Sequence, residues 1–178
     1  MRWLVPLLLA LPLVSCMNPF APPMDKSGSG SLNYLEQTSP ENVIANFRLA
    51  YTQKNLVHFR DCLDEDFRFR YFDDRTNRYE SYGLYDEGGE PGELTRTSLL
   101  FDAYEEIIIE DSSWVITSSF TELSDGDTLE VRYVSFLLMV FDYDGIYSSA
   151  EARGYAIFKF KNEENIYRIV LWEDNSIR

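Results

Sequence analysis

Acidic side chains gather at several points of the chain where they could do chemistry. Asp64-Glu65-Asp66 forms one run, and Asp73-Asp74 follows it. Close carboxylates can bind Ca²⁺ or act as general acid and base, but such a run is also typical of a solvated junction between elements. Asp142-Tyr143-Asp144-Gly145 begins like a calcium loop, yet it lacks the later ligands and favours a hairpin turn. We expect no metal site and no cofactor.

The single histidine, His58, is the other residue type suited to acid/base work. On a helix it would lie away from the apolar stripe formed by Leu56, Phe59 and Leu63, which favours a solvated position over a catalytic one. The chain has no Ser-His-Asp order, no phosphate-binding glycine loop and no zinc-ligand spacing. The catalytic residues therefore stay unassigned.

Aromatic side chains on predicted strands indicate a different chemistry, the binding of a flat apolar or sugar-like ligand. The chain has 12 tyrosines and 3 tryptophans. Our candidate pocket consists of four aromatic residues with three polar partners: Tyr133, Tyr155, Tyr167, Trp172, Arg132, Arg153 and Glu151. Aromatic residues on a sheet are also the usual constituents of a core, so both interpretations stay open.

Three helices are predicted in the first half of the chain. Ser39-Pro40-Glu41 is typical of a helix start, since serine caps the helix, proline fits its first position and glutamate suits its positive end. The apolar residues that follow share one helical face. A shorter helix is predicted over 55–63 and a third over 95–104, after a long loop or irregular hairpin at 73–92.

The remaining segments are rich in β-branched and aromatic residues and predict strands. They cover 67–72, 107–109, 114–123, 128–141, 147–161 and 166–173. Short turns separate the later strands, which indicates an antiparallel meander. Gly154 lies within one strand pattern, where it indicates a bulge or bend in a curved sheet.

Helices followed by a curved antiparallel sheet resemble the nuclear transport factor 2-like superfamily, also called cystatin-like or ketosteroid isomerase-like. The resemblance rests on four segments: Ser39-Pro40-Glu41-Asn42-Val43, Ala50-Tyr51, Cys62-Leu63-Asp64-Glu65-Asp66-Phe67-Arg68-Phe69 and Tyr167-Arg168-Ile169-Val170-Leu171-Trp172-Glu173-Asp174. It implies an α+β domain with N-terminal helices packed on the concave face of a strongly curved antiparallel sheet. The superfamily includes isomerases, dehydratases, cyclases and non-catalytic modules, so the fold does not assign an activity.

The segment before this domain resembles a bacterial lipoprotein signal. Trp3 to Val14 carry no charge, and Leu13-Val14-Ser15-Cys16 resembles the lipobox in which the cysteine receives the lipid. The resemblance implies a signal peptide over 1–15, lipidation at Cys16 and a membrane anchor in the cell envelope. Met17-Asn18 contains no aspartate after the cysteine, which favours the outer membrane, facing the periplasm.

Composition separates a linker from a folded domain in the rest of the chain and argues against nucleic acid as a partner. Proline, glycine and serine predict a flexible linker over 16–38, and a single domain follows over 39–178. The formal net charge of −14 repels phosphate backbones, so we expect no nucleic-acid partner. Cys62 has no internal partner once Cys16 carries lipid, and its apolar neighbours indicate a buried free thiol.

These observations favour an envelope lipoprotein whose domain binds an unidentified protein or small-molecule ligand without catalysing a reaction. The alternative is a small isomerase, dehydratase or cyclase-like enzyme that uses a carboxylate in the cavity between helices and sheet. The superfamily resemblance also implies a homodimer formed through the outer face of the sheet.

Overall fold

The computed structural model describes residues 33–124 and 126–177. The expected signal peptide at 1–15, the lipidation site Cys16 and the linker as far as residue 32 lie outside the described residues. The folded unit begins at Asn33 rather than at residue 39. Tyr34 stacks on His58 with ring centroids 3.7 Å apart, and the Leu35 backbone exchanges two hydrogen bonds of 2.7 Å with the Asn46 side chain. Residues 34–38, which we call the strap, therefore pack on the domain.

Two helices open the folded unit, and the local sequence explains where each begins. α1 (Pro40–Thr52) starts after Ser39, whose hydroxyl accepts a hydrogen bond of 3.2 Å from the backbone N–H of Asn42. α2 (Leu56–Asp61) starts after Asn55, whose side chain accepts from the backbone N–H of His58 at 3.2 Å. Each cap satisfies a backbone donor that the helix itself leaves unpaired.

The rest of the described chain forms a seven-stranded sheet with a third helix inserted between strands. The elements are β1 (Leu63–Asp73), β2 (Arg78–Gly83), α3 (Glu93–Ala103), β3 (Glu106–Ile109), β4 (Val115–Ser124), β5 (Asp127–Phe141), β6 (Ala150–Glu163) and β7 (Ile166–Ile177). The strand order is β2-β1-β7-β6-β5-β3, and β4 also pairs with β5.

The sheet is mixed, whereas the sequence predicted an antiparallel one. β1 pairs with β7 in parallel, and every other pair of strands is antiparallel. The parallel pair joins the first and last strands of the domain. Because no turn connects these two strands, turn residues in the sequence carry no information about their pairing.

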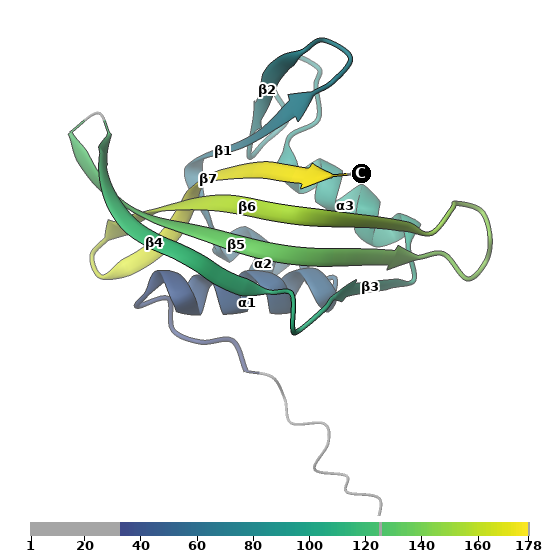
Figure 1. Ribbon diagram of the computed structural model, residues 1–178, viewed down its shortest axis with the longest axis horizontal. Helices are drawn as coiled ribbons and strands as arrows, with labels where there is room; N and C mark the ends of the chain where they lie inside the picture. The colour runs from purple at the N-terminus through teal and green to yellow at the C-terminus, as the bar shows by residue number, and fades with distance from the viewer. Residues whose placement is uncertain (1–32, 125, 178) are drawn as a thin grey trace, which may run out of the picture. The chain divides into compact units, whose positions relative to one another are not determined.

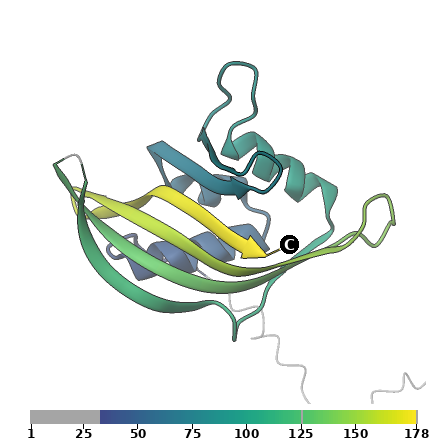
Figure 2. The same ribbon diagram turned by 45° about the horizontal axis from the view of Figure 1, so that its top comes forward.

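The helices lie on the concave face of the sheet, as the resemblance implied (Figure 1). Figure 2 shows β4 to β7 curving around α1. The core fills the space between these layers and contains fully buried Phe59, Phe158 and Phe160. Burial of one such side chain stabilises the fold by about 1.5–3 kcal/mol relative to its exposure.

The segment predicted as a loop or irregular hairpin contains β2, and α3 begins at Glu93, two residues before the predicted start at Thr95. Phe101 of α3 packs against Tyr51 and Phe59, with ring centroids 5.4 Å and 6.3 Å away. α3 is therefore fixed to the first two helices by its buried face.

Cys62 is a free and fully buried thiol, which confirms the prediction made from its neighbours. Its Sγ donates to the His58 carbonyl oxygen at 3.2 Å. Burial raises the pKa of the Cys62 thiol to about 12, so the thiol stays protonated at neutral pH. Among the described residues, no helix is long and apolar enough to span a membrane.

Candidate functional site

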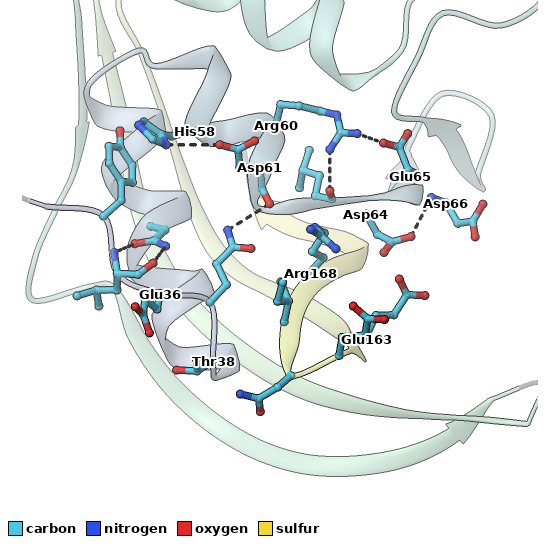
Figure 3. A pocket seen from close by; sticks show the side chains of 18 residues that line it. Glu36, Thr38, His58, Arg60, Asp61, Asp64, Glu65, Asp66, Glu163 and Arg168 are labelled. Atoms are coloured by element: carbon cyan, nitrogen blue, oxygen red, sulfur yellow. Dashed lines mark hydrogen bonds and ion pairs between the residues drawn. The ribbon is translucent and has the colours of Figure 1, made fainter.

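Two cavities compete as the candidate site, and the larger one is a charged groove. The strap groove, of about 890 Å³, lies between the strap, α2, the start of β1 and the β6–β7 turn. Figure 3 shows Asp64, Glu65, Asp66, Glu163 and Arg168 around it. The acidic run singled out in the sequence is therefore part of this groove.

Two pairs join charged groups of the strap groove. Arg60 forms an ion pair with Glu65, and His58 Nδ1 lies 3.5 Å from Asp61 Oδ2. Asp64 Oδ1 accepts from the backbone N–H of Asp66 at 3.0 Å. In the part of the chain that the structure describes, no three acidic, histidine or cysteine side chains are grouped closely enough to hold a metal ion.

The second cavity, which we call the α3 pocket, has a volume of about 410 Å³ and lies between α3 and the concave face of the sheet. Its apolar wall includes Phe69, Leu100, Phe136, Leu138 and Trp172. Its ionisable and hydroxyl-bearing groups include Tyr51, Tyr82, Glu93, Arg96 and Asp174. The α3 pocket therefore combines an apolar wall with a substantial set of polar and ionisable groups.

Glu93 is the buried acid of the α3 pocket, and the start of α3 fixes its position. Gly92 caps the helix, and a Cβ atom there would lie 2.3 Å from the backbone carbonyl carbon of Tyr85. Asp86 Oδ1 accepts from the Gly92 N–H at 2.9 Å and from the Thr95 hydroxyl at 2.7 Å. The helix start is therefore pressed against Tyr85, which leaves Glu93 only 4 % exposed.

Burial controls the ionisation of Glu93. Loss of water around the carboxyl group raises its pKa to about 7, although hydrogen bonds from Thr97 and Tyr82 and the charge of Arg96 act in the opposite direction. The Thr97 hydroxyl donates to Glu93 Oε1 at 2.8 Å. Near neutral pH both protonation states of Glu93 are populated, so the group can accept or donate a proton.

Two tyrosines beside Glu93 remain protonated. Burial raises the pKa of Tyr82, and the negative charge of Glu93 raises it further. Burial likewise raises the pKa of Tyr51, with added effects from the charges of Glu93 and Asp174. Arg96 lies over the Tyr82 ring, with its Cζ 4.3 Å from the ring centroid. The pocket therefore combines an acid that titrates near neutrality with two protonated phenols.

A small deep cavity of about 30 Å³ lies further into the core. It shares Tyr51, Phe136, Leu138 and Trp172 with the α3 pocket and is therefore adjacent to it. The Phe47 ring closes its far side, with its centroid 5.2 Å from that of Trp172. Packed rings thus fill most of the space around the deep cavity, and the larger α3 pocket beside it has room for a ligand.

Of the seven residues selected from the sequence, only Trp172 lines the α3 pocket. Tyr133 and Tyr155 instead stack on each other, with centroids 5.9 Å apart, and Tyr155 is 42 % exposed. Successive residues of a strand point to opposite faces. Val134 and Ala156, the neighbours of these tyrosines, are in the core, so the tyrosines themselves lie on the outer face.

The four other selected residues serve local contacts. Arg132 Nε lies 2.7 Å from Glu41 Oε1, which ties β5 to the start of α1. Arg153 forms an exposed ion pair with Glu151 at 2.7 Å. Tyr167 is partly buried against the core, and its backbone N–H donates to the Gln37 carbonyl oxygen at 2.8 Å. None of the four lines the α3 pocket.

Sequence reasoning missed Glu93, Tyr82 and Arg96. A glutamate at a helix start is usually a solvated residue that interacts with the positive helix end. One signal could have revealed Glu93: residues 93, 97 and 101 are spaced by four and share a helix face. Since Phe101 is apolar, that face is the buried one.

Comparisons with known proteins support the fold and assign no activity. No protein-family model and no curated protein sequence matches the chain. A conserved protein from Planctomyces limnophilus superposes with a TM-score of 0.56 at 11 % identity, covering 77 % of this chain and 92 % of that one.

Two further solved structures have the same fold. The β subunit of a putative aromatic-ring-hydroxylating dioxygenase from Novosphingobium aromaticivorans gives a TM-score of 0.53 at 12 % identity, covering 80 % of this chain and 89 % of that one. The hexachlorocyclohexane dehydrochlorinase LinA-type3 from Novosphingobium barchaimii gives 0.51 at 8 % identity, covering 78 % and 84 %. The α+β fold implied by the nuclear transport factor 2-like resemblance is thereby confirmed.

Proposed function

We propose that this chain binds a small, largely apolar organic molecule in the α3 pocket. The observation that carries this proposal is a cavity of about 410 Å³ with an apolar wall and a buried acid, Glu93. Cavities of about 300–1,000 Å³ are typical of small-molecule sites. The strap groove is larger, but most of the residues that line it are polar or charged.

The proposal places this binding domain at the cell envelope. Leu13-Val14-Ser15-Cys16 and the uncharged stretch from Trp3 to Val14 support a lipidated N-terminus at Cys16. The absence of aspartate at Met17-Asn18 supports the outer membrane, with the domain facing the periplasm. The anchored domain would then hold its ligand close to the membrane surface.

The binding proposal is tested by filling the pocket. Ala152 lines the α3 pocket, and Ala152→Trp inserts a large side chain into it. Calorimetry with tetralin, a neutral bicyclic hydrocarbon, should give saturable binding to the parent chain and at least tenfold weaker binding to the variant. Ala150→Trp is the matched control, because Ala150 is exposed on the same strand and does not line the pocket. Equal affinities of the parent and Ala152→Trp would refute the proposal.

A second candidate function is proton transfer to or from a bound ligand. It is favoured by one observation: burial raises the pKa of Glu93 to about 7, close to the value at which a general acid or base works best. The protonated Tyr51, which also lines the pocket, could donate a hydrogen bond to a negative charge that develops on the ligand.

Deuterium exchange tests this second candidate. In D₂O, NMR should show faster exchange of the hydrogens next to the carbonyl group of 1-tetralone when the chain is present. Glu93→Gln should abolish the acceleration, because the amide cannot take up the proton. Glu90→Gln, at an exposed position near the start of α3, is the control and should retain it. Exchange no faster than in buffer would leave simple binding as the function.

A further inference from the structure

Two arginines line the α3 pocket, and only one of them is paired with an acid of the protein. Arg75 Nε lies 3.3 Å from Asp73 Oδ1 in an ion pair. Arg96 forms no ion pair with any described residue, although the whole chain carries a formal net charge of −14. Arg96 therefore brings to the pocket a positive charge that has no counter-ion within the described part of the chain.

The guanidinium group of Arg96 is held in place by two contacts. Its Nε donates to the Pro91 carbonyl oxygen at 2.8 Å, and its Cζ lies 4.3 Å from the centroid of the Tyr82 ring. Neither contact occupies the two terminal nitrogens, which donate no hydrogen bond to a described residue. Because these nitrogens form a rigid planar fork that matches the two oxygens of a carboxylate, an anchored guanidinium is well suited to bind one.

The acceptors of the α3 pocket are already in use, whereas two of its donors are not. Glu93 accepts hydrogen bonds within the protein, and both oxygens of Asp174 accept from Ser176, at 3.0 Å from the backbone N–H and at 3.1 Å from the hydroxyl. The hydroxyl of Tyr51, a residue only 7 % exposed, donates to no described residue. With the terminal nitrogens of Arg96 it forms a surplus of donors, which a ligand that carries acceptors would satisfy.

The acids of the pocket limit where an anion can lie. Ionised Asp174 and Glu93 repel a negative charge, although burial raises the pKa of Glu93 to about 7 and leaves it partly neutral near pH 7. Glu93 is 4 % exposed, whereas Arg96 is exposed to solvent. An anionic group would therefore lie at the solvent-facing rim beside Arg96, and the apolar body of the ligand would lie deeper, against residues such as Phe136 and Trp172.

We propose that the ligand of the α3 pocket is an apolar carboxylic acid whose carboxylate pairs with Arg96 at the rim and whose body packs on the apolar wall. This inference rests on the proposed binding function and narrows the ligand class to amphipathic anions. A carboxylic acid with an ordinary pKa of about 4 is ionised at neutral pH, so the pairing is available there. A hydrocarbon would leave Arg96 without a counter-ion, and an amine would add donors to a pocket that already has too many.

The experiment compares three ligands that share one naphthalene ring and differ in charge: 2-naphthoate, 2-naphthamide and 2-naphthylmethylamine. Calorimetry on the full chain at pH 7.5 should show 2-naphthoate binding about tenfold tighter than the neutral amide, the effect of one charge-assisted hydrogen-bonded pair, and the cationic amine binding most weakly. Equal affinities for 2-naphthoate and 2-naphthamide, or tighter binding of the amine, would overturn the inference.

A pair of arginine variants identifies the group that recognises the charge. Arg96→Gln should reduce the ratio of the 2-naphthoate and 2-naphthamide affinities to about one. Arg153→Gln is the matched control, because it removes the same charge from an exposed ion pair that does not line the pocket, so it should keep the ratio of the parent chain. An equal loss in both variants would attribute the preference to overall charge and overturn the role of Arg96. If Arg96→Gln does not fold, the three ligands on the unmodified chain decide the question.

The possible results distinguish this inference from the function on which it rests. If Ala152→Trp still blocks tetralin but 2-naphthoate binds no tighter than 2-naphthamide, the carboxylic acid is overturned and the binding proposal stands. Failure of tetralin and of all three naphthalene ligands to bind would overturn both.

Discussion

At Glu93, opposing effects act on one carboxyl group. The first turn of α3 favours the ionised form by about 0.3–1 kcal/mol, and hydrogen bonds from Thr97 and Tyr82 favour it as well. Burial opposes ionisation and is the larger effect, since the pKa rises to about 7. The acid is therefore held in a position that costs the fold stability when it ionises. Such sites are often functional.

This balance predicts how stability depends on pH. Between pH 4.5 and about 7 the folded chain keeps the Glu93 proton that the unfolded chain releases, so the free energy of unfolding falls as pH rises. Each pH unit in this window costs about 1.4 kcal/mol, which gives a loss of about 3 kcal/mol from this group. Glu93→Gln should remove that loss, as measured by urea unfolding from pH 4.5 to 8.

The control for this prediction is Glu90→Gln, which changes the net charge equally at an exposed position. Its unfolding free energy should follow the parent chain across the same pH range. If the Glu93→Gln and parent curves run parallel, Glu93 does not titrate in this window and loses its role as the acid of the pocket.

The sequence predicted only part of the site. Trp172 could be selected because it lies on a strand near the end of the chain and combines a large ring with a polar group. Tyr133 and Tyr155 also lie on strands and combine a large ring with a polar group. The alternation of side chains along a strand nevertheless puts them on the outer face. Which face is buried depends on where the helices pack. The burial of Glu93 could not be predicted, because it depends on the close approach of Gly92 to the backbone of Tyr85. The sequence does not show that these two segments meet.

At the scale of elements, the local signals located the helices and most strands. Capping residues showed where α1 begins, and turn residues separated the later strands. The parallel pairing of β1 with β7 was not predictable, because it depends on the closure of the whole sheet. The sequence predicted a loop or irregular hairpin where β2 lies and did not predict the strand itself. The residues of β2 are mostly exposed and show little alternation of apolar and polar side chains.

Gly154 gives a prediction at this scale. The pairing of β6 with β5 and β7 continues regularly through it, so it marks a close approach of strands and not a change of register. A Cβ atom there would lie 2.5 Å from the Asn175 carbonyl oxygen. Gly154→Ala should therefore lower the free energy of unfolding by about 1–3 kcal/mol, as overpacking does, with guanidinium unfolding as the measurement.

Gly83→Ala is the matched control for Gly154→Ala. The nearest atom to its added Cβ would be Arg68 Nη1 at 3.6 Å, an ordinary contact with a flexible side chain. We expect it to change the free energy of unfolding by less than about 0.5 kcal/mol. Similar losses in both variants would show that the contact with Asn175 has no special cost.

At the scale of the whole molecule, the proposed anchor and the α3 pocket belong to separate parts of the chain. The strap is held on the domain by Leu35 and by the bond from Gln37 Nε2 to the Asp61 carbonyl oxygen at 3.1 Å. A change before residue 33 alters no residue that lines the α3 pocket. The membrane attachment and the ligand binding can then be tested independently in one chain.

The proposed membrane attachment predicts different outcomes at the two cysteines. Lipid on Cys16 would hold the chain through acyl chains, each worth about 0.8 kcal/mol per buried CH₂ group, so Cys16→Ser should release the chain from the membrane fraction. The same variant should lose incorporation of labelled palmitate and keep its affinity for tetralin, because the pocket is untouched. Cys62→Ala should keep both the label and the membrane association, since Cys62 is a buried free thiol. A Cys16→Ser chain that sediments with the membrane as the parent does would show that another segment makes the attachment.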